Sequence, residues 1–305
     1  MSQALALAVL AGVLSGTMWL VQMTGSIGVL AVLTAYFCQI PLMLAGLTMG
    51  LPGTLIAVAA AALINGIFIG VLPALLFLAA FGGPSLLVVR QALLSRQDGS
   101  DVIWYPPGMI LAQLALLAVF GIALAFWAFM SQPDGIVGVV ETVLTEVITQ
   151  LSTAAGQPVP DLTDLGRWTP LVLAAAASSW LIMAVLNAVL AQTIAVRAGW
   201  NRRPSPQLVD LDLPPWLWPL MGVAVLAAMI GSGGIGMFGS AALIVLIVPF
   251  GFLGLAVIHK FANRWSYRQL GLAAVYVGII VFNWPILAVV ALGLVEDWAH
   301  LRRYM

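Results

Sequence analysis

Charged residues are scarce in this chain. They make up 7% of its 305 residues, whereas 63% are hydrophobic. Soluble domains contain roughly 25% charged residues, so this composition excludes an ordinary soluble fold and makes lipid the solvent of most of the chain. The formal net charge is zero, which leaves no basic excess for a phosphate backbone and argues against nucleic-acid binding.

Residues that perform chemistry are scarce as well. Cys38 is the one cysteine, which excludes an internal disulfide and a cysteine metal cluster. His259 and His300 have no second ligand four residues later in the sequence, and both lie at the expected cytoplasmic boundary, so a metal site there is not expected. The sequence contains no nucleotide-binding loop, zinc-protease motif or nucleophile elbow. We therefore expect no catalytic residues, no cofactor and no metal, and we do not expect an enzyme.

The middle of each long apolar stretch lacks Asp, Glu, Lys and Arg. Proton-coupled transporters usually have an acid or a histidine inside the membrane, because that group must exchange the proton. The absence of such a group argues against a proton-driven secondary transporter.

Long apolar stretches dominate what is present. Eight of them approach the ~20 residues that cross a bilayer as a helix, at residues 4–23, 28–48, 51–71, 72–89, 109–130, 169–195, 216–230 and 236–258. A last stretch, 269–295, is interrupted at Asn283-Trp284-Pro285, where proline bends or ends a helix. We predict an all-α polytopic integral membrane protein with nine or ten membrane segments, in a single transmembrane domain over residues 1–305.

Basic residues indicate the orientation in the membrane. Ten of the eleven lie in four short gaps between apolar stretches: Arg90, Arg96, Arg197, Arg202, Arg203, Lys260, Arg264, Arg268, Arg302 and Arg303. Basic residues in short loops mark the cytoplasmic side, so we expect a bacterial inner-membrane protein with both termini in the cytoplasm. The same rule favours a short or re-entrant hairpin for residues 269–295, because a single long span would place the last two arginines outside. The single span remains the alternative.

Residues 131–168 form the one sizeable polar segment on the expected outer side. Apolar residues recur within it at helical spacing, at Val137, Val140, Leu144, Val147 and Leu151, and acids lie on the other side. We predict an extracytoplasmic amphipathic insertion that caps the outer ends of the spans. A lid over an outward-facing site and a docking surface for a partner are the alternatives.

Amide side chains are the main polar groups within the spans, and in lipid such groups seek hydrogen-bond partners. Taken singly, each is expected to bond to a neighbouring helix. Taken together, they form a candidate polar pocket for a neutral or weakly charged small molecule. Its predicted lining residues are Asn65, Gln113, Asn187 and Gln192.

The carboxyl-terminal end holds a second candidate site. Glu296 and Asp297 follow the last apolar stretch, and on a helix neither has a cation four residues later. We expect one of them to pair with a cation of the preceding basic loop and so to close the hairpin, the candidates being Lys260, Arg264 and Arg268. A solvated tail is the alternative.

The same region carries a family resemblance. Residues 252–260 read FLGLAVIHK, and residues 292–298 read LGLVEDW and are followed by Arg302 and Arg303. This pattern resembles the closing region of the YybS-like family of bacterial predicted membrane proteins, a domain of unknown function. The resemblance implies a distant similarity to substrate-binding subunits of energy-coupling-factor vitamin transporters and to a membrane component of the rod-shape elongation machinery. It implies no catalytic residues.

We therefore expect a non-enzymatic integral membrane component that binds a small molecule or lipid for transport. Its expected partners are membrane lipids, a small-molecule ligand and partner membrane subunits. The alternative is a membrane scaffold protein of cell-envelope assembly. A cavity lined by the span amides would favour the first function, whereas solid packing with an apolar external patch would favour the second.

Overall fold

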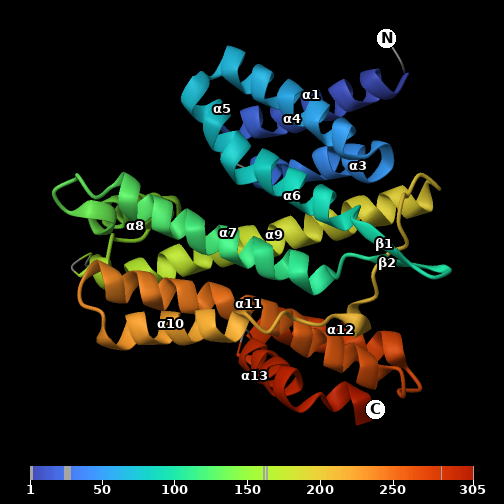
Figure 1. Ribbon diagram of the computed structural model, residues 1–305. Coiled ribbons are helices and arrows are strands. Elements are labelled where there is room, and N and C mark those ends of the chain that lie inside the picture. Colours follow the sequence, from blue (N-terminus) through green and yellow to red (C-terminus); the bar gives the residue numbers. More distant parts are fainter. Residues whose placement is uncertain (1–2, 24–28, 161, 163, 283, 305) are drawn as a thin grey trace. The chain divides into compact units, whose positions relative to one another are not determined.

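The computed structural model describes residues 3–23, 29–160, 162, 164–282 and 284–304, and this part of the chain is largely helical (Figure 1). The helices are α1 (Gln3–Met23), α2 (Val29–Phe37), α3 (Gln39–Met49), α4 (Leu51–Phe68), α5 (Val71–Phe77), η1 (Leu78–Gly82), α6 (Gly83–Ala92), α7 (Pro107–Ala128), α8 (Gly135–Ala154), η2 (Leu165–Trp168), α9 (Thr169–Arg197), η3 (Leu208–Asp210), α10 (Leu217–Ile230), α11 (Gly234–Ala262), α12 (Arg268–Phe282), α13 (Pro285–Ala299) and η4 (Leu301–Tyr304). Two strands, β1 (Ser95–Asp98) and β2 (Asp101–Trp104), complete the elements.

Seven helical segments of the described chain are long and apolar enough to cross a membrane: Gln3–Met23, Leu51–Phe68, Val71–Ala92, Pro107–Ala128, Gly135–Ala154, Leu165–Arg197 and Gly234–Ala262. Three shorter apolar helices, Leu33–Met49, Leu217–Ile230 and Arg268–Phe282, lie between or after them. A largely helical, multi-pass membrane architecture is therefore supported. The expected total of nine or ten segments depends on the short helices and stays a prediction.

The chain forms two compact units, which we describe separately. The first comprises Met1–Leu114 and Ile182–Asp212, and the second comprises Ala115–Leu181 and Leu213–Met305. The boundary between the units falls inside α7 and α9.

In the first unit, α1 packs along α4 and also contacts α3. Gly12 of α1 permits this close approach, because a Cβ atom there would overlap the Ala57 carbonyl and lie 2.8 Å from the Ala60 Cβ. Small residues at helix crossings let membrane helices meet backbone to backbone. An aromatic group of Trp19, Phe77 and Phe81 fills the adjoining core, with the Trp19 and Phe81 rings 4.9 Å apart.

Two membrane segments of the first unit are irregular, and a proline accounts for each irregularity. The second segment is interrupted at Cys38, three residues before Pro41, and Val71–Ala92 contains the π-helical turn η1 just before Pro84. In a regular α-helix the proline ring clashes with the carbonyl four residues earlier. A break or a wider π turn relieves this clash.

A small antiparallel hairpin in the first unit was not predicted from the sequence. Strands β1 and β2 pair from Ser95 opposite Trp104 to Asp98 opposite Asp101, and Gly99 supplies a positive φ in the turn. The all-α prediction therefore lacks one element. The reason is that four-residue strands with polar residues carry almost no periodic signal.

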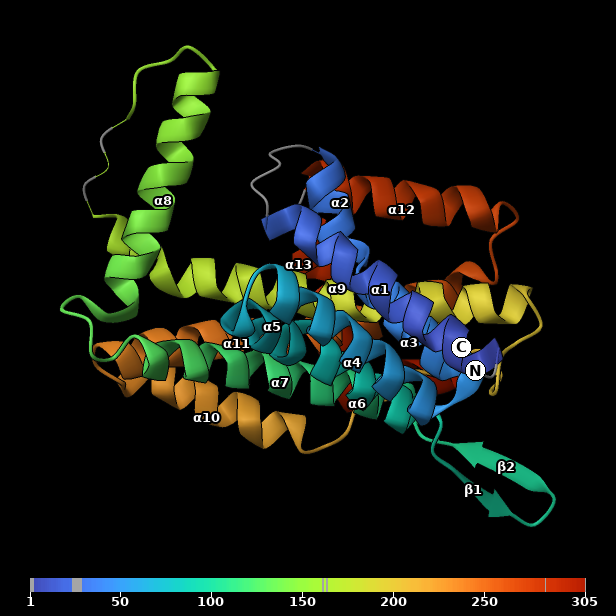
Figure 2. The same cartoon turned by 90° about the horizontal axis from the view of Figure 1, so that it is seen from above.

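In the second unit, α10 and α11 run side by side, and α13 packs tightly on α11 (Figure 1). The stretch 269–295 is divided into α12 and α13, as the hairpin interpretation expects, and Asn283 lies outside the described residues. The predicted amphipathic helix is present as α8, which buries Ile136 and Val140 and leaves half of its residues exposed. Figure 2 shows α8 running across the direction of α10 and α11.

Candidate functional site

The four amides predicted to line a polar pocket form hydrogen bonds at separate places in the first unit. Asn65 donates to the Ala61 carbonyl of its own helix at 2.8 Å. Gln113 donates to the Tyr105 hydroxyl at 2.9 Å, and Gln192 donates to the Arg203 carbonyl at 2.9 Å. Neither of the two described cavities is lined by any of the four amides. The polar pocket therefore stays a prediction, and these contacts favour the structural role expected for each amide singly.

Asn187 takes part in a buried polar cluster at the interruption of the second segment. Its Nδ2 donates to the Tyr36 carbonyl at 2.7 Å and lies 3.5 Å from Gln39 Oε1. Gln39 Nε2 in turn donates to the carbonyl of Phe81, inside the π turn, at 3.4 Å. The amide side chains of Gln39 and Asn187 thus connect the two irregular points of the backbone.

Such a connection has a physical purpose within a membrane. Where a helix is interrupted, backbone groups lose their partners, and lipid offers none. The Cys38 carbonyl, at the break itself, accepts a 2.6 Å hydrogen bond from Ser15 of α1. The described residues nevertheless leave the buried Asn187 Oδ1 without a partner. The cluster therefore stabilises the broken segment and retains one unused acceptor.

Two consecutive arginines close helix ends in the same unit. Arg202 Nε donates to the Thr48 carbonyl near the end of α3 at 2.8 Å, and Arg203 Nη1 donates to the Ala92 carbonyl at the end of α6 at 2.9 Å. Cations are favoured at helix carboxyl ends, where carbonyls lack partners. Arg203 is buried, stacks 5.5 Å from the centre of the Trp104 ring, and burial lowers the pKa of its guanidinium. These two members of the basic gap thus have a structural role as well as the topological one expected from the charge rule.

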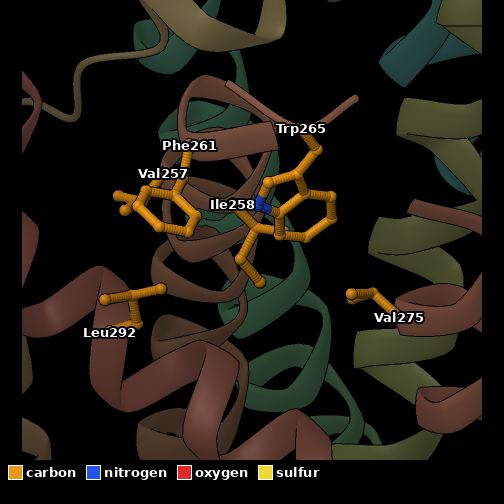
Figure 3. A pocket seen from close by; sticks show the side chains of 6 residues that line it. All are labelled: Val257, Ile258, Phe261, Trp265, Val275 and Leu292. Atoms are coloured by element: carbon orange, nitrogen blue, oxygen red, sulfur yellow. The ribbon is translucent and has the colours of Figure 1, made fainter. Parts of the chain in front are cut away.

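An apolar crevice lies in the second unit (Figure 3). It has a volume of about 290 Å³ and is partly open. Its lining residues come from α11, the following loop, α12 and α13: Val257, Ile258, Phe261, Trp265, Val275 and Leu292. Sequence reasoning missed this crevice, because every lining residue is of a type that also faces lipid or fills a core.

The crevice exists because α11 packs very differently against α13 and against α12. A Cβ atom at Gly254 would overlap the Val289 carbonyl, and one at Gly293 would overlap the Phe250 carbonyl, so α11 and α13 meet backbone to backbone. By contrast, none of the described residues of α12 is buried. The space that α12 leaves beside this tight pair is the crevice.

Aromatic contacts hold α12 at its distance from α11. The Trp265 indole lies over Gly271, where a Cβ atom would collide with the ring, and it meets the Phe261 ring edge to face at 6.0 Å. The His259 and Tyr276 rings meet at 5.9 Å. Trp265 therefore serves both as a wall of the crevice and as a spacer for α12.

Three basic residues lie close in sequence to the lining residues Phe261 and Trp265. Lys260 is in the last turn of α11, Arg268 begins α12, and Arg264 lies between them. No Asp or Glu occurs between residues 213 and 295. This part of the second unit therefore combines an apolar cavity with cations that have no nearby acid in the sequence.

The two acids of the predicted closure have other partners in the structure. Glu296 is buried and forms an ion pair with Arg302, with 2.7 Å between Oε1 and Nε. It also accepts a 3.1 Å hydrogen bond from the Arg302 backbone N–H. Asp297 accepts a 2.6 Å hydrogen bond from the Trp218 indole N–H of α10. Neither acid forms an ion pair with Lys260 or Arg268 among the described residues, and closure by the basic loop stays a prediction.

The difference has a simple cause. In a continuing helix, residues 296 and 302 would lie too far apart to pair. The structure ends α13 at Ala299, and His300 adopts a left-handed conformation with φ of +50°. The chain reverses there, which brings Arg302 back to Glu296.

A second cavity, of about 480 Å³, lies along the polar side of α8 and is wide open. It is lined by Asp134, Gly138, Glu141, Thr142, Thr145 and Glu146. Three of the five acids of the predicted insertion thus line this open cavity.

Comparisons with known proteins bear on the whole chain. No curated protein and no solved structure matches it. A family model described as "Predicted membrane protein (DUF2232)" matches residues 16–296, which confirms the resemblance seen at the carboxyl-terminal motif. The chain therefore belongs to the DUF2232 family of predicted membrane proteins.

Proposed function

We propose that this protein is a non-enzymatic integral membrane component that binds a membrane lipid in the crevice of its second unit, for transport together with partner subunits. The observation that carries the proposal is the crevice itself, which is lined only by apolar side chains. Its volume of about 290 Å³ is near the lower end of ligand pockets. A cavity of this kind suits a hydrocarbon chain better than a polar small molecule.

The alternative ligand, a neutral polar molecule held by span amides, has less support. Asn65, Gln113 and Gln192 are used in separate hydrogen bonds, and Asn187 bridges backbone irregularities. The charge rule remains the basis for proposing a bacterial inner membrane and cytoplasmic termini. Since the sequence has no nucleotide-binding loop, active transport would require an external motor.

The lipid proposal can be tested by native mass spectrometry of the full chain released from mild detergent. Val275→Trp places an indole in the crevice, whereas Val277→Trp makes the same change at an exposed position of α12 outside the lining. We expect the wild-type protein and V277W to retain lipid and V275W to lose it. Equal retention by both variants would refute a lipid site in the crevice.

A scaffold of cell-envelope assembly is the second candidate, and α8 is the observation that favours it. This helix runs across the direction of α10 and α11 (Figure 2) and exposes apolar residues such as Val143 and Leu151 beside its acidic face. An exposed apolar stripe with polar margins is typical of an interaction surface. Photo-crosslinking from position 143 in membranes tests this role, and a reproducible crosslink to one envelope protein would favour it over transport.

A further inference from the structure

We propose that the crevice accepts one acyl chain of an anionic phospholipid, whose phosphate is bound by Lys260 and Arg268. This inference rests on the proposed function and names the chemical class of its ligand. The volume and lining of the crevice admit a hydrocarbon chain and provide no polar group for a head group. The proposal therefore places the head group outside the crevice, near the loop between α11 and α12.

Arg268 is placed to meet that head group. It precedes Val275, which lines the crevice, by seven residues on α12. Seven residues are almost two full turns, so both side chains leave the same face of the helix, roughly 10 Å apart along its axis. Gly271 lies between them on that face and is covered by Trp265. The crevice-facing side of α12 thus runs from an apolar wall, past an indole, to a guanidinium.

Lys260 provides the second cation on α11. It directly precedes Phe261 and follows Val257 by three residues, so it is a surface neighbour of the lining residues. Lysine side chains extend from apolar surface toward the membrane boundary and keep the ammonium hydrated. Neither Lys260 nor Arg268 forms an ion pair with an acid among the described residues.

Charge complementarity then selects the ligand class. The segment 213–295 has no carboxylate of its own, so these cations are available to an anionic group. Tryptophan and tyrosine favour the head-group level of a bilayer, and Trp265 and the exposed Tyr267 lie between the two cations in sequence. An apolar slot, an aromatic boundary and two cations together match the chain, glycerol region and phosphate of an anionic phospholipid.

The test compares two lipids with identical acyl chains in native mass spectrometry of the full chain. One lipid is phosphatidylglycerol, which is anionic, and the other is phosphatidylcholine, which is zwitterionic. Each cation near an anionic lipid is worth roughly a five-fold change in binding, so two of them give a preference of roughly 25-fold. We expect the double variant K260Q/R268Q to lose this preference for phosphatidylglycerol and still to bind both lipids.

A matched control removes the same charge elsewhere. Arg90 and Arg197 are exposed and lie in the first unit, so R90Q/R197Q should keep the preference for phosphatidylglycerol. If lipid retention is sensitive to V275W but shows no preference for the anionic lipid, or a preference that K260Q/R268Q leaves unchanged, the head-group inference is wrong and the crevice function stands. If V275W has no effect on either lipid, both proposals are wrong.

Discussion

At the scale of residues, the ion pair between Glu296 and Arg302 holds the residues that follow α13 against the last turn of that helix. The side chains of Glu296 and Arg302 are 3% and 11% exposed, so the pair is largely removed from water. A buried charge that loses its partner is costly, whereas an exposed pair contributes little. The pair is therefore expected to stabilise the end of α13 appreciably.

We predict that Glu296→Gln destabilises the protein by about 2 kcal/mol, because it preserves the shape of the side chain and leaves the Arg302 guanidinium buried without its carboxylate. The measurement is the unfolding temperature in detergent. Glu146→Gln removes an exposed acid of α8 and should change stability by less than about 0.5 kcal/mol. Equal unfolding temperatures for the two variants would mean that the pair has no structural role.

Arg203 leads to a second prediction at this scale. Its guanidinium combines a hydrogen bond to the end of α6 with stacking on Trp104. We predict that Arg203→Gln lowers stability by about 2 kcal/mol, the range of a hydrogen bond from a charged donor. Arg203→Lys should recover only part of this loss, because an ammonium lacks the planar stacking surface.

The measurement for these two variants is thermal unfolding in detergent, with the exposed Arg197→Gln as the control. If Arg203→Lys is fully stable while Arg203→Gln is not, charge alone suffices and the stacking contributes nothing.

At the scale of elements, glycine positions set how closely helices approach. At the crossing of α11 and α13 a Cβ atom on Gly293 would overlap the Phe250 carbonyl. We predict that Gly293→Ala and Gly254→Ala each destabilise the pair by about 1–3 kcal/mol, the usual cost of overpacking. The measurement is the fraction of protein that stays monodisperse after heating.

The control for this prediction lies on α12. Gly278 has open space where a Cβ atom would project, so Gly278→Ala should be neutral or should stabilise the helix by up to about 1 kcal/mol. Tolerance of alanine at position 293 to the same degree would show that α11 and α13 are farther apart than the structure places them.

At the scale of the whole molecule, the membrane topology rests on the distribution of charge. We predict that Arg96→Cys and Arg264→Cys, in a Cys38→Ser background, are labelled from the cytoplasmic side. Glu146→Cys should be labelled from the outer side only. All three positions are exposed, so a membrane-impermeant thiol reagent can reach each of them from one side. Labelling of positions 96 and 146 from the same side would overturn the proposed topology.

The sequence by itself determined the class of the protein and the approximate location of most of its long helices. Composition excluded a soluble fold, and apolar length located the spans, because crossing a bilayer requires a run of consecutive apolar residues. The interruption at Trp284-Pro285 and the amphipathic helix α8 were also readable. Both features depend on residues that are close together in the sequence. Hydrophobic periodicity therefore predicts the amphipathic helix, and proline predicts the interruption.

Only the tertiary structure decided which groups meet. Glu296 pairs with Arg302 because the chain reverses at His300. The spacing of residues in the sequence does not predict a left-handed conformation at that position. Asn187 meets Tyr36 and Gln39 across about 150 residues of sequence. The crevice arises because glycines bring α13 against α11 while Trp265 keeps α12 away. A cavity forms where one helix packs closely and its neighbour is held farther away, and these distances depend on tertiary contacts. In the sequence, an apolar residue looks the same whether it faces lipid, a neighbouring helix or an empty space.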